Sequence, residues 1–391
     1  MGARITWLYW INIALWMPAV FIMFGAIFAA LFQPDLGLWG QIGLGIALCW
    51  LTAWINCLPL RLSKWIPNLG TPLKFAVILT LGAGGLLYGL EHGFANDLSL
   101  SATLKRLDEG LAYIPVIVYG CLGVELISAE SGAIRNPERN IPRAMLIAGL
   151  LTAVCYIFGT LGVLAAVPAE RIDTVDIIAV SLRELFGSAP QGETLALLVG
   201  GAALLTFFST MVTWTLGGNC AMAEAGAARE MPAAFAKKHH RHGAPVGAAL
   251  LTAGVSSATL LLYGLMAGSA EELFWTLFSF SAIIFLLPYI GMHLAYLKLR
   301  RRDVQRAGSF RIPGRRLHRL LSINCILILV AAIGLFFWVP GEPLDLFFLV
   351  QVGCGVVVTL LLGEYLVQLG ERHRKTAGRP VEKLPADEMP S

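Results

Sequence analysis

The stretch YGCLGVELISAESGAIRNPERNIPR, residues 119–143, decides how this chain is interpreted. It begins inside an apolar segment, carries glycines at positions 120 and 123, places the ionisable Glu125 two residues later and ends in a basic loop with two prolines. Two glycines followed by a carboxylate are atypical of a continuous membrane helix. In secondary carriers, discontinuous helices expose backbone amides and carbonyls to a small polar solute near the bilayer midplane. The stretch therefore predicts a helix that breaks at membrane depth.

The composition around this stretch is that of a membrane protein. Hydrophobic residues make up 57% of the 391 positions and charged residues 14%, and the mean hydropathy is +0.71. A bilayer span needs about 20 mostly apolar residues. Segments that satisfy this are residues 7–32, 38–58, 71–90, 111–129, 143–167, 195–222, 244–267, 273–297, 320–339 and 344–366. We therefore predict an all-α polytopic membrane protein with about ten transmembrane helices.

The distribution of basic residues predicts the orientation. If these segments alternate in direction, the Lys and Arg residues fall on one side, except for Lys105, Arg106, Arg171 and Arg183. Under the positive-inside rule this asymmetry places both termini in the cytoplasm, in a multi-pass protein of the inner (plasma) membrane. Residues 1–370 form the predicted transmembrane domain, and the charged, proline-containing residues 371–391 form a predicted disordered cytoplasmic tail. We see no nucleic-acid footprint in the charge pattern.

Glu125 and the glycines before it are the first candidate site. An ionisable side chain within the membrane is a functional candidate by default, because its burial is costly. The alternative is a carboxyl that hydrogen-bonds a neighbouring helix and never titrates. Gly120, Cys121, Leu122 and Gly123 are interpreted as an unwound segment that meets a substrate. The alternative for the glycines is close helix packing.

Trp214 and Asn12 are the second pair of candidates. Trp214 lies in the middle of its segment, whereas membrane tryptophans concentrate at the interfaces, and its ring face could contact a cationic substrate. Ordinary helix packing is the alternative for Trp214. Asn12 either faces the cavity or hydrogen-bonds a neighbouring helix. A set of hydroxyls suggests a cation site, with bonds to their own backbone as the alternative: Thr206, Ser209, Thr210 and Thr213.

The other titratable residues are interpreted as structural or solvent-exposed and not as part of a binding site. Glu364 lies near the cytoplasmic end of its segment and is interpreted as structural. The seven cysteines lie in or beside apolar segments and are interpreted as packing residues. The run KKHHRH, residues 237–242, repels metal cations and is interpreted as a solvated patch near anionic lipid. We expect no metal, no cofactor and no enzymatic activity, since no phosphate-binding loop or nucleophile triad is present. Residues 225–243 are expected to hold a short helix before a basic turn.

At this point the sequence resembles the amino acid–polyamine–organocation superfamily of carriers. Residues 119–145 resemble its sixth helix and the following loop, residues 214–246 its eighth helix, short cytoplasmic helix and start of the ninth, and SFRIPG the loop before the eleventh. Within the superfamily the pattern is similar to the arginine/agmatine and glutamate/GABA antiporters. The resemblance implies a LeuT-like fold of inverted five-helix repeats with about twelve spans. It also implies that Tyr119 is an aromatic gate and that Glu125, Trp214 and Asn12 match pocket residues.

The resemblance places the first span of this chain on the third helix of the family. The first two helices, including the glycine-rich break that holds a substrate carboxylate, have no counterpart here. We favour a start assigned too late over a decayed or specialised paralogue. We expect the cavity beside Tyr119, Glu125 and Trp214 to be open on one side, and the chain alone to transport poorly until about two upstream spans of roughly 20 residues each are restored.

These observations predict secondary active transport of an amino acid or polyamine by alternating access. Antiport and proton-coupled symport both remain open, so protons join the small-molecule substrate and the bilayer as candidate partners. The alternative function is that of a non-transporting membrane sensor, partner subunit or degenerate relic. The sequence leaves the oligomeric state and the substrate's identity open.

Overall fold

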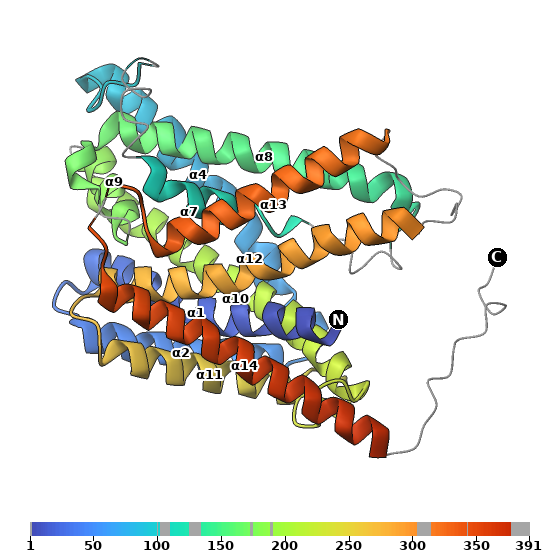
Figure 1. Cartoon of the computed structure of the whole chain (residues 1–391). Helices are drawn as coiled ribbons and strands as arrows, with labels where there is room; N and C mark the ends of the chain where they lie inside the picture. Colours follow the sequence, from blue (N-terminus) through green and yellow to red (C-terminus); the bar gives the residue numbers. More distant parts are fainter. Residues whose placement is uncertain are drawn as a thin grey trace.

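The computed structural model describes residues 2–99, 101, 110–124, 134–172, 175–187, 191–302, 314–341 and 343–376. In this part of the chain the regular elements are all helices, and nine of them are long and apolar enough to cross a membrane. They lie side by side along a common direction, with the first residues of α1 and the end of α14 at the same end of the bundle (Figure 1). The protein is thus an all-α polytopic membrane protein, as the composition predicted.

The long helices are α1 Gly2–Phe32, α2 Leu38–Asn56, α4 Trp65–His92, α8 Pro137–Ala166, α10 Gly192–Ala227, α11 Val246–Gly264, α12 Ala270–Arg302, α13 Arg315–Phe337 and α14 Leu346–Thr376. The short ones are α3 Leu60–Ser63, α7 Ile114–Gly120 and α9 Ile177–Phe186, with 3₁₀ turns at Leu111–Tyr113 and Ala169–Arg171. Every segment expected from hydropathy contains a helix. Of the expected span at residues 111–129, the described part ends at Val124 and holds only the 3₁₀ turn Leu111–Tyr113 and α7.

Helix α1 is the centre of the bundle. It packs against α12, α10, α2, α11 and α14, and Phe21, Ile13 and Met17 are among its completely buried side chains. Because α1 is apolar on every side, it can contact protein all around its circumference. Helix α12 is also deeply enclosed, whereas the apolar window of α8 is only 6% buried. The core therefore lies around α1 and α12, and α8 lies at the periphery.

Buried polar side chains join α1 to α10 and α11. The Trp10 indole Nε1 donates to Asn219 Oδ1 at 3.1 Å and to Thr252 Oγ1 at 2.9 Å, and Thr252 donates to Asn219 Oδ1 at 2.6 Å. One turn further along α11, Ser256 Oγ donates to the carbonyl of Ala14 at 2.6 Å. An unmade hydrogen bond is expensive in an apolar interior, so these contacts fix the relative register of the three helices.

Helices α4 and α8 form a second unit held by glycine contacts. A Cβ atom at Gly85 would lie 2.0 Å from the carbonyl oxygen of Gly162, and one at Gly82 would lie 2.2 Å from the Phe158 ring. Small residues allow membrane helices to approach closely enough for backbone contact. This pair meets the rest of the bundle through α10, where a Cβ at Gly70 would lie 2.0 Å from Ser209 Oγ.

Some boundaries differ from the predictions. Helix α8 begins at Pro137, before the expected position 143, because proline is tolerated in the first turn of a helix. Helix α14 continues to Thr376, beyond the domain boundary predicted at 370. The short helix predicted in residues 225–243 was wrong: after α10 ends at Ala227 the chain forms turns, including Phe235 N to Pro232 O at 3.1 Å.

Candidate functional site: a helix end beside an aromatic cluster

The helix that was predicted to break at the glycines does end there, and the residues directly after Val124 lie outside the described part of the chain. Helix α7 ends at Gly120, and residues 121–123 are not helical. Cys121 N still donates to the Ile117 carbonyl at 3.1 Å, and Leu122 N donates to the Tyr119 carbonyl at 3.1 Å. Gly123 then has φ of +101°, a conformation that side-chain-bearing residues rarely adopt. The glycine at 123 therefore turns the chain away from the helix axis.

The last carbonyl of α7 is capped from another helix. Tyr156 of α8 donates its hydroxyl hydrogen to the Gly120 oxygen at 3.0 Å. A Cβ at Gly120 would lie 3.2 Å from the same tyrosine ring, so glycine allows this approach. A helix C-terminus carries partial negative charge, which favours a nearby cation. The break therefore presents an electronegative backbone end.

Six aromatic rings gather beside this helix end, and we call them the aromatic cluster. They come from four helices and are Tyr9 and Trp16 of α1, Tyr119 of α7, Trp214 of α10, and Phe278 and Phe285 of α12. The centroid of the Tyr119 ring lies 5.1 Å from Phe278, 5.2 Å from Phe285 and 6.1 Å from Trp16. Tyr119 and Trp214, chosen separately from sequence, thus contact the same partners.

Trp214 contacts both the aromatic cluster and the non-helical residues 121–123 that follow α7. Its ring centroid lies 5.7 Å from Trp16 and 6.4 Å from Tyr9. A Cβ at Gly123 would lie 2.8 Å from Cη2 and 3.1 Å from Cζ2 of the same indole. The indole therefore packs directly on the non-helical backbone, and the absence of a side chain at 123 makes room for it.

Asn12 lies on the face of α1 that carries Tyr9 and Trp16, since residues three and four apart share a helix face. Its side chain is 1% exposed, and its Oδ1 has no hydrogen-bond partner among the described residues. An unpaired buried acceptor is costly and marks a position where a donor is missing. The neighbour-helix bond considered from sequence is not formed at this oxygen.

The candidate hydroxyls mostly bond backbone carbonyls. Thr206 donates to Ala203, Thr210 to Thr206 and Thr213 to Ser209, each within α10. Ser209 instead donates to the Ile66 carbonyl of α4 at 3.1 Å. The Lys74 ammonium of α4 donates to Thr210 Oγ1 at 3.1 Å. Of the four hydroxyls, Thr210 therefore has a cation of the protein itself as a partner.

Two acidic residues, Glu125 and Glu364, were singled out from the sequence within predicted membrane segments. Glu125 lies outside the described residues, so its surroundings stay a prediction. Glu364 accepts from Arg4 Nε at 2.7 Å and from Arg4 Nη2 at 2.8 Å, which joins α14 to α1. Glu364 therefore has the structural partner that its position suggested.

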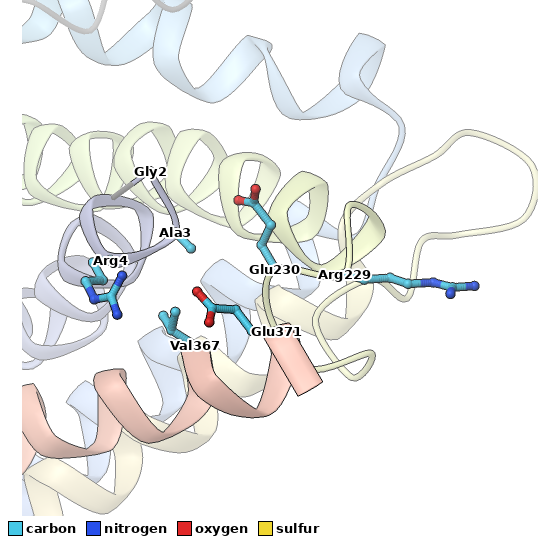
Figure 2. A pocket seen from close by; sticks show the side chains of 7 residues that line it. All are labelled: Gly2, Ala3, Arg4, Arg229, Glu230, Val367 and Glu371. Carbon is cyan, nitrogen blue, oxygen red and sulfur yellow. The ribbon is translucent and has the colours of Figure 1, made fainter. Parts of the chain in front are cut away.

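A polar depression lies near this ion pair, at the end of the bundle where α1 begins. Figure 2 shows the Arg4 and Glu371 side chains pointing into the same space, while Arg229 points away from it. Gly2, Ala3, Glu230 and Val367 complete the lining. The depression opens among the helix termini and contains no member of the aromatic cluster. In the described part of the chain, no group of three or more His, Cys, Asp or Glu side chains is arranged so that it could hold a metal ion.

Several site residues were not identified from sequence alone. The sequence analysis missed four aromatic residues of the cluster, which form two pairs: Tyr9 with Trp16 in α1, and Phe278 with Phe285 in α12. The two residues of each pair are seven positions apart in the sequence. That spacing returns a side chain to the same helix face and was a usable signal. Tyr156 carried no such signal, because its role depends on the position of α7.

The structure is a bundle of apolar helices in which α7 ends at a glycine turn, beside a partly buried aromatic cluster. The sequence profile of the amino acid permease family matches residues 3–359. The chain therefore belongs to the amino acid permease family, which confirms the resemblance drawn from residues 119–145 and 214–246.

Individual relatives agree with this family. The chain is 28% identical over 370 residues to the probable agmatine/putrescine antiporter AguD of Lactococcus lactis, covering 94% of this chain and 78% of the relative. It is 26% identical over 364 residues to an uncharacterised transporter of Legionella pneumophila, covering 91% and 77%. Over 185 residues it is 29% identical to the serine/threonine exchanger SteT of Bacillus subtilis, covering 46% and 41%.

Proposed function

We propose that this permease moves an amine-bearing substrate, an amino acid or polyamine, by secondary active exchange through alternating access. The observation that carries the proposal is the end of α7 at Gly120, beside the aromatic cluster. Aromatic faces attract cations, and so does the negative end of a helix. An ammonium group would meet both at this place. Relatives named as an antiporter of agmatine and putrescine and as a serine/threonine exchanger support exchange of this substrate class.

The proposed substrate-binding residues are those chosen from the sequence. The backbone of Gly120, Cys121, Leu122 and Gly123 would meet the polar groups of the substrate, and Tyr119 and Trp214 would cover it. The unpaired Asn12 oxygen would accept a donor from the substrate. Glu125 would supply the neutralising carboxylate.

The proposed orientation places both termini in the cytoplasm. The Arg4–Glu364 pair supports a common side for the two ends, because it joins the start of α1 to the C-terminal part of α14. Residues 1–370 would form the transport domain, in the inner membrane. Labelling of single cysteines with a membrane-impermeant maleimide, introduced at the start of α1 and after α14, would test this arrangement.

Exchange by proteoliposomes tests the main proposal. Vesicles that hold the purified protein would be loaded with unlabelled agmatine, putrescine, arginine, serine or threonine and given the same labelled compounds outside. The protein would be tested as this chain and with any upstream segment that its gene encodes. We expect saturable uptake that requires a loaded amine, and we expect it to be weaker for this chain alone than for a form with an upstream segment. Binding of a labelled amine without exchange in either form would instead indicate a sensor or partner subunit.

Two variants separate a cation-binding site from simple packing. Trp214→Phe keeps an aromatic face, whereas Trp214→Leu removes it at comparable hydrophobicity. We expect the leucine variant to lose more affinity for dicationic agmatine than for zwitterionic serine, by about tenfold or less given a cation–π contribution of about 1 kcal/mol. Equal losses for both substrates would contradict the role of the ring face.

Coupling to protons is proposed through Glu125. If this carboxyl takes up a proton during the cycle, Glu125→Gln should flatten the pH dependence of exchange and leave expression and folding intact. An unchanged pH profile, or a protein that fails to fold, would support a structural carboxyl instead.

A further inference from the structure

The loop between α10 and α11 carries six consecutive side chains that are cationic or become cationic on protonation. We call this segment, residues 237–242, the basic hairpin; it comprises Lys237, Lys238, His239, His240, Arg241 and His242. All are exposed except His239, which is partly buried. None of them belongs to the aromatic cluster, so the transport proposal leaves the segment without a role.

Backbone hydrogen bonds give the basic hairpin a defined shape. His239 N donates to the Ala244 carbonyl at 2.8 Å, and Gly243 N donates to the His239 carbonyl at 2.9 Å. The His239 ring stacks on His242, with centroids 3.8 Å apart and planes 11° apart, and lies 4.7 Å from His240. The three imidazoles therefore form one stacked group.

The turns that lead into the basic hairpin are anchored in the core. Met231 and Phe235 are buried, and the Phe235 ring meets the edge of Trp10 at 4.9 Å. On the far side, Gly247 N donates to the Lys237 carbonyl at 2.8 Å. The bundle thus presents the cationic side chains outward from a fixed base.

The charges around the imidazoles are mostly of one sign. The charges that act on His239 are those of His242, His240 and Arg241, all in the hairpin. Beside them, Lys238 pairs with the highly exposed Glu224 near the end of α10, and Cys220 lies near this pair. Within the described residues, no carboxylate is among the groups that act on His239.

The His239 imidazole responds to this environment. Partial burial, followed by the proximity of His242, His240 and Arg241, lowers the pKa of His239 below its usual value, which is about 6.5 for free histidine. At neutral pH this ring is uncharged, and protonation on acidification adds positive charge beside existing positive charge. A bound anion would relieve that repulsion, so anion binding and proton uptake favour each other.

Helix α10, which leads to the hairpin, is longer than the hydrocarbon core of a membrane. Helix α10 has 36 residues, which is about 54 Å of helix at 1.5 Å per residue. This length exceeds the roughly 30 Å hydrocarbon core, so the end of α10 reaches the interface. Phosphate oxygens of lipids accept charge-assisted hydrogen bonds from Lys, Arg and protonated His.

We propose that the basic hairpin binds the anionic phosphate headgroups of the surrounding leaflet, and that this binding strengthens as the pH falls. Each cation near an anionic surface contributes about five-fold in affinity. Lys237, Lys238 and Arg241 provide the binding that persists at neutral pH. His239, which stacks on both other imidazoles, provides the increment at acidic pH, because a bound anion favours its protonation. The proposal is independent of which substrate the protein carries.

Lipid binding by the full chain in neutral detergent tests this proposal. The tagged protein is immobilised and equilibrated with mixed micelles that contain fluorescent phosphatidylglycerol, at pH 7.5 and at pH 5.5, with fluorescent phosphatidylcholine as the reference. We expect phosphatidylglycerol binding to rise at least five-fold on acidification and phosphatidylcholine binding to stay constant. Added inorganic phosphate at 10-fold excess over lipid should not displace the lipid.

Three sets of variants assign the effect to named side chains. The triple variant H239Q/H240Q/H242Q should bind as wild type at pH 7.5 and rise less than two-fold at pH 5.5. K237Q/K238Q should bind less at both pH values. R61Q/K64Q removes one exposed cation within α3 and one directly after it, and is the matched control, which should behave as wild type.

Specific outcomes would overturn the proposal. An acid-dependent rise that persists in the triple variant would remove the imidazoles from the mechanism, and equal losses in the control would reduce the hairpin to a general charge effect. Displacement by inorganic phosphate would show a site for free phosphate rather than for lipid. H239Q alone changes a single side chain, which guards against misfolding, and should lose most of the rise.

Discussion

Alanine at position 123 is the sharpest test of the broken helix. Gly123 has φ of +101°, and a left-handed backbone costs an L-residue about 1–2 kcal/mol. The new Cβ would also lie 2.8 Å from Cη2 of Trp214. That indole is held by Trp16 and Tyr9, and overpacking of this kind costs about 1–3 kcal/mol. Gly123→Ala should therefore destabilise this conformation by about 2–5 kcal/mol, or at least tenfold in its population.

Equilibrium binding of labelled agmatine and putrescine to the purified protein would measure the effect, alongside the thermal unfolding midpoint. Gly217→Ala is the matched control, because it lies in α10 with open space around its Cβ position. A double-mutant cycle with Trp214→Phe separates the two contributions. The smaller ring should recover the steric part and leave the backbone part. The reasoning fails if Gly123→Ala binds and unfolds as Gly217→Ala does.

Three further predictions concern helix contacts. Tyr156→Phe removes the hydroxyl that caps the Gly120 carbonyl. It should lower the unfolding free energy by about 0.5–1.5 kcal/mol, as measured by thermal unfolding in detergent. An unchanged unfolding free energy would mean that another donor replaces the hydroxyl. Thr252→Val breaks the buried contacts to the indole of α1 and the amide of α10 and should cost about 1–3 kcal/mol, whereas a neutral result would show a water in its place. Gly85→Ala should separate α4 from α8 and lower the thermal unfolding midpoint. Gly84→Ala should leave the midpoint unchanged, because its Cβ would lie 3.5 Å from Leu185, an ordinary contact distance. Equal unfolding midpoints of the two variants would refute the close contact.

The sequence by itself predicted the helical spans and the glycines at which α7 ends. Both depend on local properties: a run of about 20 apolar residues needs no partner to be a membrane helix, and a glycine that turns the chain does so through its own backbone. The same reasoning failed in residues 225–243, where a short helix was expected and turns formed. Those turns depend on Phe235 reaching Trp10, a contact from a distant part of the chain.

The composition of the site was decided by the tertiary structure. Tyr9 and Phe285 lie far apart in sequence, yet their ring centroids are 5.8 Å apart. A soluble helix shows its buried face by an apolar stripe, but lipid is as apolar as the protein interior, so a membrane helix can be apolar on every side. The hydropathy of α1 therefore predicted that this helix spans the membrane, but it could not predict which of its faces would contact α10 and α12. Packing made that choice, and with it the neighbours of Tyr119, Trp214 and Gly123.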